Sequence, residues 1–384
     1  MQAEGKHPPG PGQQRHISRA SLGEQISDRA NNLNLVRMIA ASAVLVSHAY
    51  PISLGPQALE PLEETTGKTL GWFAVVVFFG LSGMLIAASC ERRGEWHRFW
   101  AARVLRLFPA LAVVLVLTVI AGLFFTSLAS LAYLTSVETW TYVPRNLSLA
   151  FLQYPLPGVF EDNPYPRAIN GSLWTLFYEV TCYAGLFVIG TAGLFARRWA
   201  ITLGVVVLGM AFAILANQPA PQGIIGARGY HLVMLGFPFA LGALAYVWRE
   251  HVRFDWRVVV VLWIGAWFAL GTAIGLVILV IALLYSVGWF GFVPKGRLLN
   301  YNRLGDYSYG MYIYAFPTQQ AMAKLFGPLD PMANMALAFP VALLLAALSW
   351  HLIEQRALAQ IKQASAWLRE FPAYCSSAIR KLAQ

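Results

Sequence analysis

Charged residues are scarce in this chain. Asp, Glu, Lys and Arg make up 12% of its 384 residues, whereas soluble proteins carry about 25%. Hydrophobic residues make up 58%. This balance excludes a soluble globular enzyme, and no separate soluble catalytic domain is visible. The composition predicts an all-α integral membrane protein that crosses the bilayer many times.

Cysteine is also rare, and its spacing carries no motif. Cys90, Cys182 and Cys375 form no C-x-x-C pair, so we expect neither a disulfide framework nor a bound metal ion. The net charge of +10 does not indicate a nucleic-acid partner here, because membrane proteins retain basic residues on the cytoplasmic side. We expect membrane lipids, and no nucleic acid, around this chain.

The two ends of the chain are predicted to be cytoplasmic tails. Residues 1–30 lack an apolar h-region and a cleavage site, which excludes a secretory signal peptide. They are polar and contain the cluster Pro8–Gly12, so we predict disorder, with the first span acting as its own targeting signal. In the tail 358–384, apolar residues at helical spacing indicate an interfacial helix. These residues are Ile361, Ala364, Leu368 and Phe371.

Ten apolar runs of near-spanning length fill the membrane domain, residues 31–357, since a bilayer-crossing helix needs about 20 residues. They lie at about 33–51, 71–90, 107–134, 171–195, 199–216, 229–248, 257–272, 274–292, 305–326 and 333–357. With the N-terminus in the cytoplasm, ten spans place 23 of the 28 Lys and Arg residues on the inside. The positive-inside rule therefore predicts ten transmembrane helices with both termini cytoplasmic.

The longest segment predicted outside the cytoplasm covers residues 135–170. Five prolines lie in it, so we expect no regular helix there. They are Pro144, Pro155, Pro157, Pro164 and Pro166. Aromatic residues between the prolines lie near Asn146, Gln153, Asp162 and Asn163. Two interpretations stay open, an aromatic belt at the membrane interface and a surface for a sugar.

The first apolar run contains Arg37 and, eleven residues later, His48. On a helix the two side chains are about 20° apart around the axis and roughly 16 Å apart along it. A neutral imidazole can take a proton from a hydroxyl that attacks a carbonyl, and arginine offers phosphate a planar fork of donors. Acyl-CoA, with phosphates at one end and an acyl group at the other, fits this stripe. The alternative is a packed histidine and a snorkelling arginine.

Arg103 and Arg106 enter the third run from the cytoplasmic side. Residues at i and i+3 share a helix face, so the two guanidiniums could form an anion site at the membrane surface. Arginines also flank spans for purely topological reasons, and the spacing by itself favours that simpler interpretation.

Glu179 lies about 13 Å into the fourth run at 1.5 Å per residue, while Ser172 and Trp174 lie nearer its outer end. A carboxylate at such depth must be paired or protonated. It could orient His48, neutralise an arginine or bind an acceptor hydroxyl. A structural ion pair between helices is an equally good explanation.

The second run contains Gly80 and Gly83. Small residues at this spacing predict a close helix approach, across which Ser82 can form a hydrogen bond. A catalytic serine elbow is not indicated, because the strand–turn–helix context is missing. We expect close packing here, beside a narrow channel for the acyl group.

Together these residues resemble the membrane-bound acyltransferase-3 family, over about residues 32–356. Six motifs match in order: Arg37-X10-His48, Phe78–Gly83, Arg103-x-x-Arg106 followed by Pro109, Ser172–Glu179, Ser308-Tyr309-Gly-Met-Tyr312, and Ile353-Glu354. The resemblance implies a ten-span enzyme that takes an acyl group, typically acetyl, from cytoplasmic acyl-CoA. It would deliver this group to a hydroxyl of an extracytoplasmic or lipid-linked glycan.

The resemblance also implies roles for individual residues. His48 would be the catalytic base, Glu179 would support the catalytic site, and Arg37 would serve the donor together with Arg103 and Arg106. Substrate or supporting contacts would come from Ser82, Ser172, Trp174 and Tyr309. The sequence departs from the family pattern at Ala315, where many members carry histidine. It also carries no fused extracytoplasmic domain, so a partner that completes the transfer would be a separate protein.

The leading hypothesis is an O-acyltransferase of surface or exported polysaccharide in the bacterial cytoplasmic (inner) membrane, using acyl-CoA, most simply acetyl-CoA, without a metal. A second hypothesis keeps this chemistry with a non-glycan acceptor such as a lipid. A third is a transporter or flippase of a glycan or lipid precursor, since buried ionisable residues also suit a substrate path. A homodimer or polysaccharide-biosynthesis proteins stay open as partners.

Overall fold

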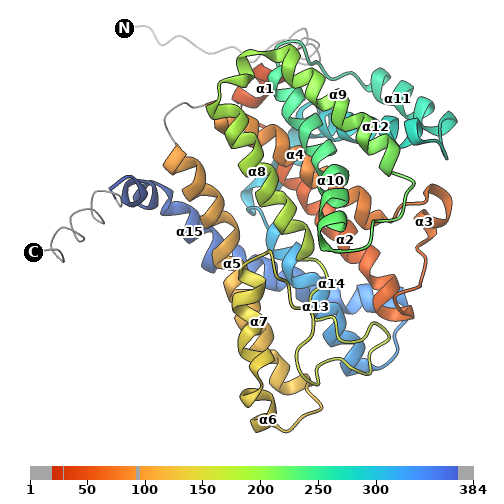
Figure 1. Cartoon of the computed structure of the whole chain (residues 1–384), viewed down its shortest axis with the longest axis vertical. Helices are drawn as coiled ribbons and strands as arrows, with labels where there is room; N and C mark the ends of the chain where they lie inside the picture. Colours follow the sequence, from red (N-terminus) through yellow and green to blue (C-terminus); the bar gives the residue numbers. More distant parts are fainter. Residues whose placement is uncertain (1–19, 29, 92–95, 371–384) are drawn as a thin grey trace, which may run out of the picture. The chain divides into compact units, whose positions relative to one another are not determined.

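A computed structural model describes residues 20–28, 30–91 and 96–370, and its regular elements there are helices, beside two isolated β-bridges (Figure 1). Within these residues, seven segments are long and apolar enough to span a bilayer. They are α2 (Leu33–Leu54), α4 (Leu70–Cys90), α5 (Trp96–Phe125), α9 (Arg198–Leu215), α10 (Ile224–Val247), α12 (Ala273–Phe292) and Pro331–Ala359, which begins with α14 (Pro331–Ser349).

Three further helices lie at the other predicted spans. They are α8 (Trp174–Thr191), the shorter α11 (Trp256–Phe268) and α13 (Ser308–Phe326). A helix is therefore found at each of the ten apolar runs, and the prediction of an all-α integral membrane protein is confirmed.

The described chain forms two compact units, of which the first contains α1 (Leu22–Asp28), residues 79–87 of α4 and residues 194–303. Within it, α4 and α10 touch through their backbones. A Cβ atom on Gly83 would lie 1.8 Å from the carbonyl oxygen of Phe239, and one on Gly242 would lie 1.9 Å from that of Gly80. The close approach predicted from Gly80 and Gly83 is confirmed, because any larger side chain there would force the helices apart.

Helix α1 corrects the prediction of a disordered tail over residues 1–30, as far as that segment is described. The Ser21 hydroxyl accepts from the Glu24 amide at 3.3 Å, and the Glu24 carboxylate accepts from the Ser21 amide at 2.7 Å. This reciprocal capping box satisfies two backbone donors that would otherwise lack partners. Residues 1–19 and 29 lie outside the described residues.

The second unit contains residues 37–78, 88–193 and 304–370 of the described chain. Helix α13 packs chiefly on α14 and also contacts α2. Arg37 of α2 bonds to Asp306, just before α13, while His48 packs on Phe316 ten residues further along α13. The Arg37 end of α2 thus lies at the start of α13 and the His48 end near its middle, so both helices run in the same overall direction, and the Gln319 side chain donates to the Leu45 carbonyl at 2.9 Å between them.

The proline-rich segment 135–170 contains a helix that the sequence analysis did not expect. Helix α7 (Val137–Leu147) follows the short α6 (Ser130–Thr135), packs against α5 (Figure 1) and includes Pro144. The prediction of no regular helix there is wrong, because a proline near the C-terminal end of a helix disturbs only the preceding turn.

Three of the amides proposed for sugar contact instead fix this segment. The Asn146 side chain donates to the carbonyl of Gln153 at 3.0 Å and accepts from its amide at 3.3 Å. The Asn163 side chain donates to the side-chain oxygen of Gln320 at 2.8 Å. These three side chains are buried, so their hydrogen bonds hold the loop on the helices.

The chain after α14 remains helical. A π-helix, η5 (Trp350–Glu354), leads into α15 (Gln355–Ala359), and residues 361–370 form another helical stretch. Helical structure in the predicted tail is thus present up to residue 370, while Phe371 lies outside the described residues. Its placement at a membrane interface stays a prediction.

Candidate active site

Helix α2 is continuous from Leu33 to Leu54. Arg37 and His48 therefore lie on one helix face, about 20° apart and roughly 16 Å apart along the axis. Pro51 is one turn beyond His48 and does not interrupt the helix between the two residues. Arg37 and His48 therefore share one face of α2, as predicted, and each of them is surrounded by different groups.

At the Arg37 end, two arginines share one carboxylate oxygen. Asp306 Oδ2 accepts from Arg37 at 2.7 Å and from Arg106 at 2.6 Å. Arg106 also donates to Glu354 Oε2 at 3.1 Å. We call Arg37, Arg106, Asp306 and Glu354 the arginine cluster. Its two guanidiniums face two carboxyl groups, and such pairing offsets the cost of burying charge in a site with little access to solvent.

The carboxylates of the arginine cluster are held in place by other groups. Asp306 lies in the loop before α13, where it accepts from the Ser308 amide at 3.3 Å. Burial raises the pKa of Asp306, but the charges of Arg37 and Arg106 outweigh this and lower it to about 2. Glu354, only 1% exposed, accepts from the Ser349 hydroxyl at 3.0 Å. The positions of both charges are therefore fixed before any ligand binds.

Tyr309 lies beside the arginine cluster and is buried. Its ring faces the Arg106 guanidinium at 5.8 Å, and its hydroxyl donates to the Leu107 carbonyl at 2.9 Å. The Trp350 ring lies 5.6 Å from the same guanidinium. Aromatic faces attract a cation at such distances, so Tyr309 supports Arg106 in its position.

At the other end of the stripe, His48 lies among apolar groups. Its ring meets the Phe316 ring edge-on at 5.1 Å, and its Nδ1 atom is buried without a hydrogen-bond partner in the structure. Phe316 also packs on Gly171, where a Cβ atom would lie 2.6 Å from the Phe316 ring. One aromatic ring therefore connects α2 with the segment that enters α8.

Ser172 follows Gly171 and is buried. Its hydroxyl oxygen also lacks a hydrogen-bond partner in the structure, while its carbonyl accepts from the Tyr312 hydroxyl at 2.6 Å. Phe316 thus contacts both His48 and the residue before Ser172. Buried polar atoms without partners are uncommon in folded proteins, and these two lie on segments that meet at one ring.

The remaining predicted residues have other surroundings. Glu179 accepts from the Tyr183 hydroxyl one turn later on α8, and the Trp174 ring meets the Tyr178 ring edge-on at 5.8 Å. Arg103 donates to the Phe99 carbonyl at 3.1 Å. Arg103 and Arg106 thus donate hydrogen bonds to different groups of the protein.

Ser82 belongs to the first compact unit, and His48 to the second. It lies on α4 between Gly80 and Gly83, the two glycines of the backbone contact with α10. Its position is consistent with the close packing predicted for this part of α4.

Two acidic residues of the second unit were not predicted as site residues. Asp306, described above, lies two residues before Ser308, and its position next to the Ser308–Tyr312 motif was the only sequence feature that pointed to it. Glu60 is buried, accepts from the Ser47 hydroxyl and accepts from the Leu70 amide at 2.9 Å. It therefore fixes the residue before His48 to the start of α4, a contact that no local pattern could indicate.

Comparisons with known proteins identify the family of this chain. The family described as an acyltransferase domain matches residues 31–351. An O-acetyl transferase of Shigella phage Sf6 is 29% identical over 346 residues, covering 86% of this chain and 96% of the relative. Nodulation protein 10 of Rhizobium leguminosarum bv. viciae is 28% identical over 384 residues, covering 87% and 95%. None of the solved structures matches the chain. This multi-pass membrane protein belongs to the acyltransferase-3 family and is an acyltransferase.

Proposed function

We propose that the chain is an O-acyltransferase of the bacterial cytoplasmic membrane. It transfers an acyl group, most simply acetyl, from cytoplasmic acyl-CoA to a hydroxyl of a glycan or lipid-linked glycan on the other side. The observation that carries this proposal is the single helix α2, which joins the arginine cluster to His48, whose buried Nδ1 has no partner in the structure. The relative named O-acetyl transferase supports the same chemistry.

In this mechanism, His48 accepts the proton of the acceptor hydroxyl as its oxygen attacks the thioester carbon. The C–S bond then breaks, the acyl group stays on the acceptor oxygen, and the CoA thiolate takes up a proton. His48 must be neutral to act, and its apolar surroundings favour the neutral imidazole. The buried Ser172 hydroxyl lies on a segment that also contacts Phe316, where it can donate to a nearby acceptor atom.

The arginine cluster would hold the phosphates of the donor. A guanidinium carries five N–H donors in a planar fork. The Asp306 carboxylate accepts a hydrogen bond from one N–H donor of Arg37. Arg37 can therefore bind a carboxylate and a phosphate together. Its side chain is 25% exposed, so it is accessible to a ligand, whereas Arg106 is engaged by two carboxylates and serves to hold Asp306.

The direction of α13 supports ten spans. Seven of the predicted spans separate α2 from α13 in the chain: α4, α5, α8, α9, α10, α11 and α12. If all seven cross the bilayer, α2 and α13 cross it in the same direction, which agrees with their parallel contacts. If only one of the shorter helices α8 and α11 failed to cross, the two directions would be opposite.

The test is His48→Gln in a strain whose own gene is deleted. Gln keeps a polar side chain of similar size but cannot accept a proton at neutral pH. We expect the acetyl mass increments of the surface glycans to disappear, while the protein stays in the membrane at normal abundance. His231→Gln, a substitution in the first unit, is the matched control and should keep them. Full acylation by His48→Gln would refute the proposed base, and unchanged glycans after the deletion would refute the acceptor class.

A further inference from the structure

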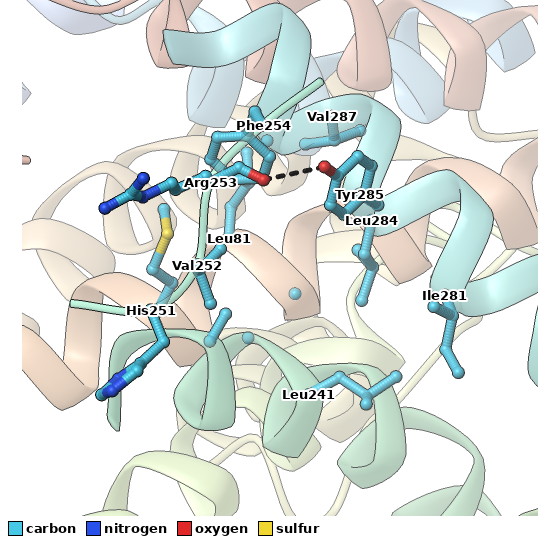
Figure 2. A pocket seen from close by; sticks show the side chains of 15 residues that line it. Leu81, Leu241, His251, Val252, Arg253, Phe254, Ile281, Leu284, Tyr285 and Val287 are labelled. Carbon is cyan, nitrogen blue, oxygen red and sulfur yellow. Dashed lines mark hydrogen bonds between the residues drawn. The ribbon is translucent and has the colours of Figure 1, made fainter. Parts of the chain in front are cut away.

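A pocket lies within the first compact unit, beside the contact between α4 and α10 (Figure 2). It has a volume of about 350 Å³ and is lined by residues 80–84 of α4, the end of α10, residues 251–254 and residues 281–288 of α12. Its walls are aliphatic at Leu81, Leu241, Ile281 and Leu284. Small-molecule sites span about 300–1,000 Å³, so this pocket can hold a short ligand or part of a longer one.

Glycines leave this space beside the backbones. A Cβ atom on Gly80 would lie 2.3 Å from the Leu284 side chain, and one on Gly288 would lie 2.4 Å from the Phe254 ring. Leu284 and Phe254 can therefore lie flat against the helices and line the pocket. The cavity therefore depends on glycine at positions 80 and 288.

One side of the pocket is basic. His251 and Arg253 are exposed alternate residues of a segment after α10, and Figure 2 shows their side chains pointing to the same side, away from Leu241 and Ile281. The Tyr285 hydroxyl donates to the Arg253 carbonyl at 2.8 Å. The neighbouring carbonyl of Val252 accepts from the amide of Leu22 at 2.9 Å. The basic side is thus built on a fixed backbone.

The pocket runs from polar to apolar along the helix axis. Helix α10 ends at Val247, and Leu241 lies six residues earlier, about 9 Å deeper at 1.5 Å per residue. His251 and Arg253 come after the helix end, where a membrane helix meets the headgroup region. The carboxylate of the neighbouring Glu24 accepts from the Ser21 amide at 2.7 Å, and Glu24 is not among the residues that line the pocket.

We propose that this pocket binds a lipid with a phosphoryl headgroup. Part of an acyl or prenyl tail fills the space between Leu241, Ile281 and Leu284, and the phosphoryl group lies against Arg253 and His251. A guanidinium binds phosphate through paired charge-assisted hydrogen bonds. The same chemistry is offered by a membrane phospholipid and by a polyprenyl phosphate carrier.

Native mass spectrometry of the purified full chain in detergent tests this inference. The probes are phosphatidylglycerol, a polyprenyl phosphate and diacylglycerol, which has tails but no phosphate. Arg253→Gln removes the headgroup contact, Ala245→Phe fills the pocket, and Arg257→Gln removes a nearby charge outside the pocket lining. Circular dichroism and thermal unfolding in the same detergent establish that each variant is folded.

We expect one or both phosphoryl lipids to bind, and Arg253→Gln to weaken that binding about tenfold, as the loss of one charge-assisted contact implies. Ala245→Phe should abolish it, while Arg257→Gln leaves it within about twofold. The tighter of the two probes identifies the source of the lipid. Diacylglycerol binding as tight as that of the phosphoryl lipids would overturn the proposal. Unchanged binding by folded Ala245→Phe, or equal losses in Arg253→Gln and Arg257→Gln, would do the same.

Discussion

The substitution Asp306→Asn should destabilise the fold, because one oxygen of Asp306 pairs with two arginines. Asn keeps one oxygen for the Ser308 amide, but its NH2 group replaces the oxygen that accepts from Arg37 and Arg106, so the change removes the charge and these two hydrogen bonds. One ion pair at about 4 Å is worth about 4 kcal/mol at an effective dielectric of 20, before the cost of desolvation. Lowering the pKa from 3.8 to about 2 corresponds to about 2 kcal/mol. We expect a loss of about 2–3 kcal/mol in the free energy of unfolding.

The pH dependence of this loss has a definite sign. The pKa of Asp306 is lower in the folded protein than its ordinary value of 3.8. Its stabilising charge is therefore fully present above pH 4, and it is lost as the pH falls towards about 2. The gap between wild type and Asp306→Asn should be smaller at about pH 3 than at about pH 5.

Denaturant unfolding in mixed micelles measures these free energies. The matched control is Asp162→Asn, which removes an exposed carboxylate that pairs with Lys324 at 3.2 Å. Surface pairs contribute about 0–1 kcal/mol, so this variant should stay close to wild type. The reasoning is refuted if Asp306→Asn is no less stable than Asp162→Asn, or if its gap to wild type does not shrink between about pH 5 and pH 3.

Other expected outcomes concern packing and topology. Gly83→Ala should lower the free energy of unfolding by about 1–3 kcal/mol through overpacking, because its Cβ atom would meet the Phe239 carbonyl. Gly204→Ala is the control and should not lower it, since a Cβ atom on Gly204 would meet open space. Equal effects of the two substitutions on unfolding in micelles would contradict the backbone contact. A reporter fused after Gly158 should read as extracytoplasmic and one fused after Arg197 as cytoplasmic, and the reverse result would invert the topology.

Much of the fold follows from composition and periodicity. Each apolar run contains a helix because the backbone in hydrocarbon must satisfy its own hydrogen bonds. The contact at Gly80 and Gly83 was predictable from residue size alone. Helices α1 and α7 were not expected. The capping box at Ser21, which begins α1, lies within a polar tail whose composition indicates disorder. Helix α7 lies in a segment rich in proline and contains Pro144, a residue that disfavours helices.

The site was predictable where its residues share one helix. The spacing of eleven residues between Arg37 and His48, together with the geometry of a helix, places both side chains on one face. Asp306 is 269 residues from Arg37, and Glu60 is joined to α4 through a loop. Such contacts depend on how distant helices pack, and no periodic pattern encodes them. The same limit applies to Arg103 and Arg106, whose shared face does not determine which groups they contact.

The separation of the two ends of α2 leads to a prediction about the donor. A ligand that contacts Arg37 and reacts beside His48 must span roughly 16 Å. An acyl thioester without the nucleotide, such as the acetyl thioester of N-acetylcysteamine, has no phosphates for Arg37 to bind. Binding energy from such remote groups is used to position the reacting centre, so this short donor should react slowly with the wild type.

The short donor also separates donor binding from structural damage. Arg37→Gln should raise the KM for acetyl-CoA about tenfold or more while leaving the rate with the short donor nearly unchanged, because that rate does not use the lost contact. Arg37→Lys should recover only part of the loss, since a lysine lacks the bidentate fork. If Arg37→Gln slowed both donors equally, Arg37 would act by holding Asp306 in place, and the arginine cluster would be a structural feature. Because His48→Gln removes the base, it should slow both donors, and this contrast assigns distinct roles to the two ends of one helix.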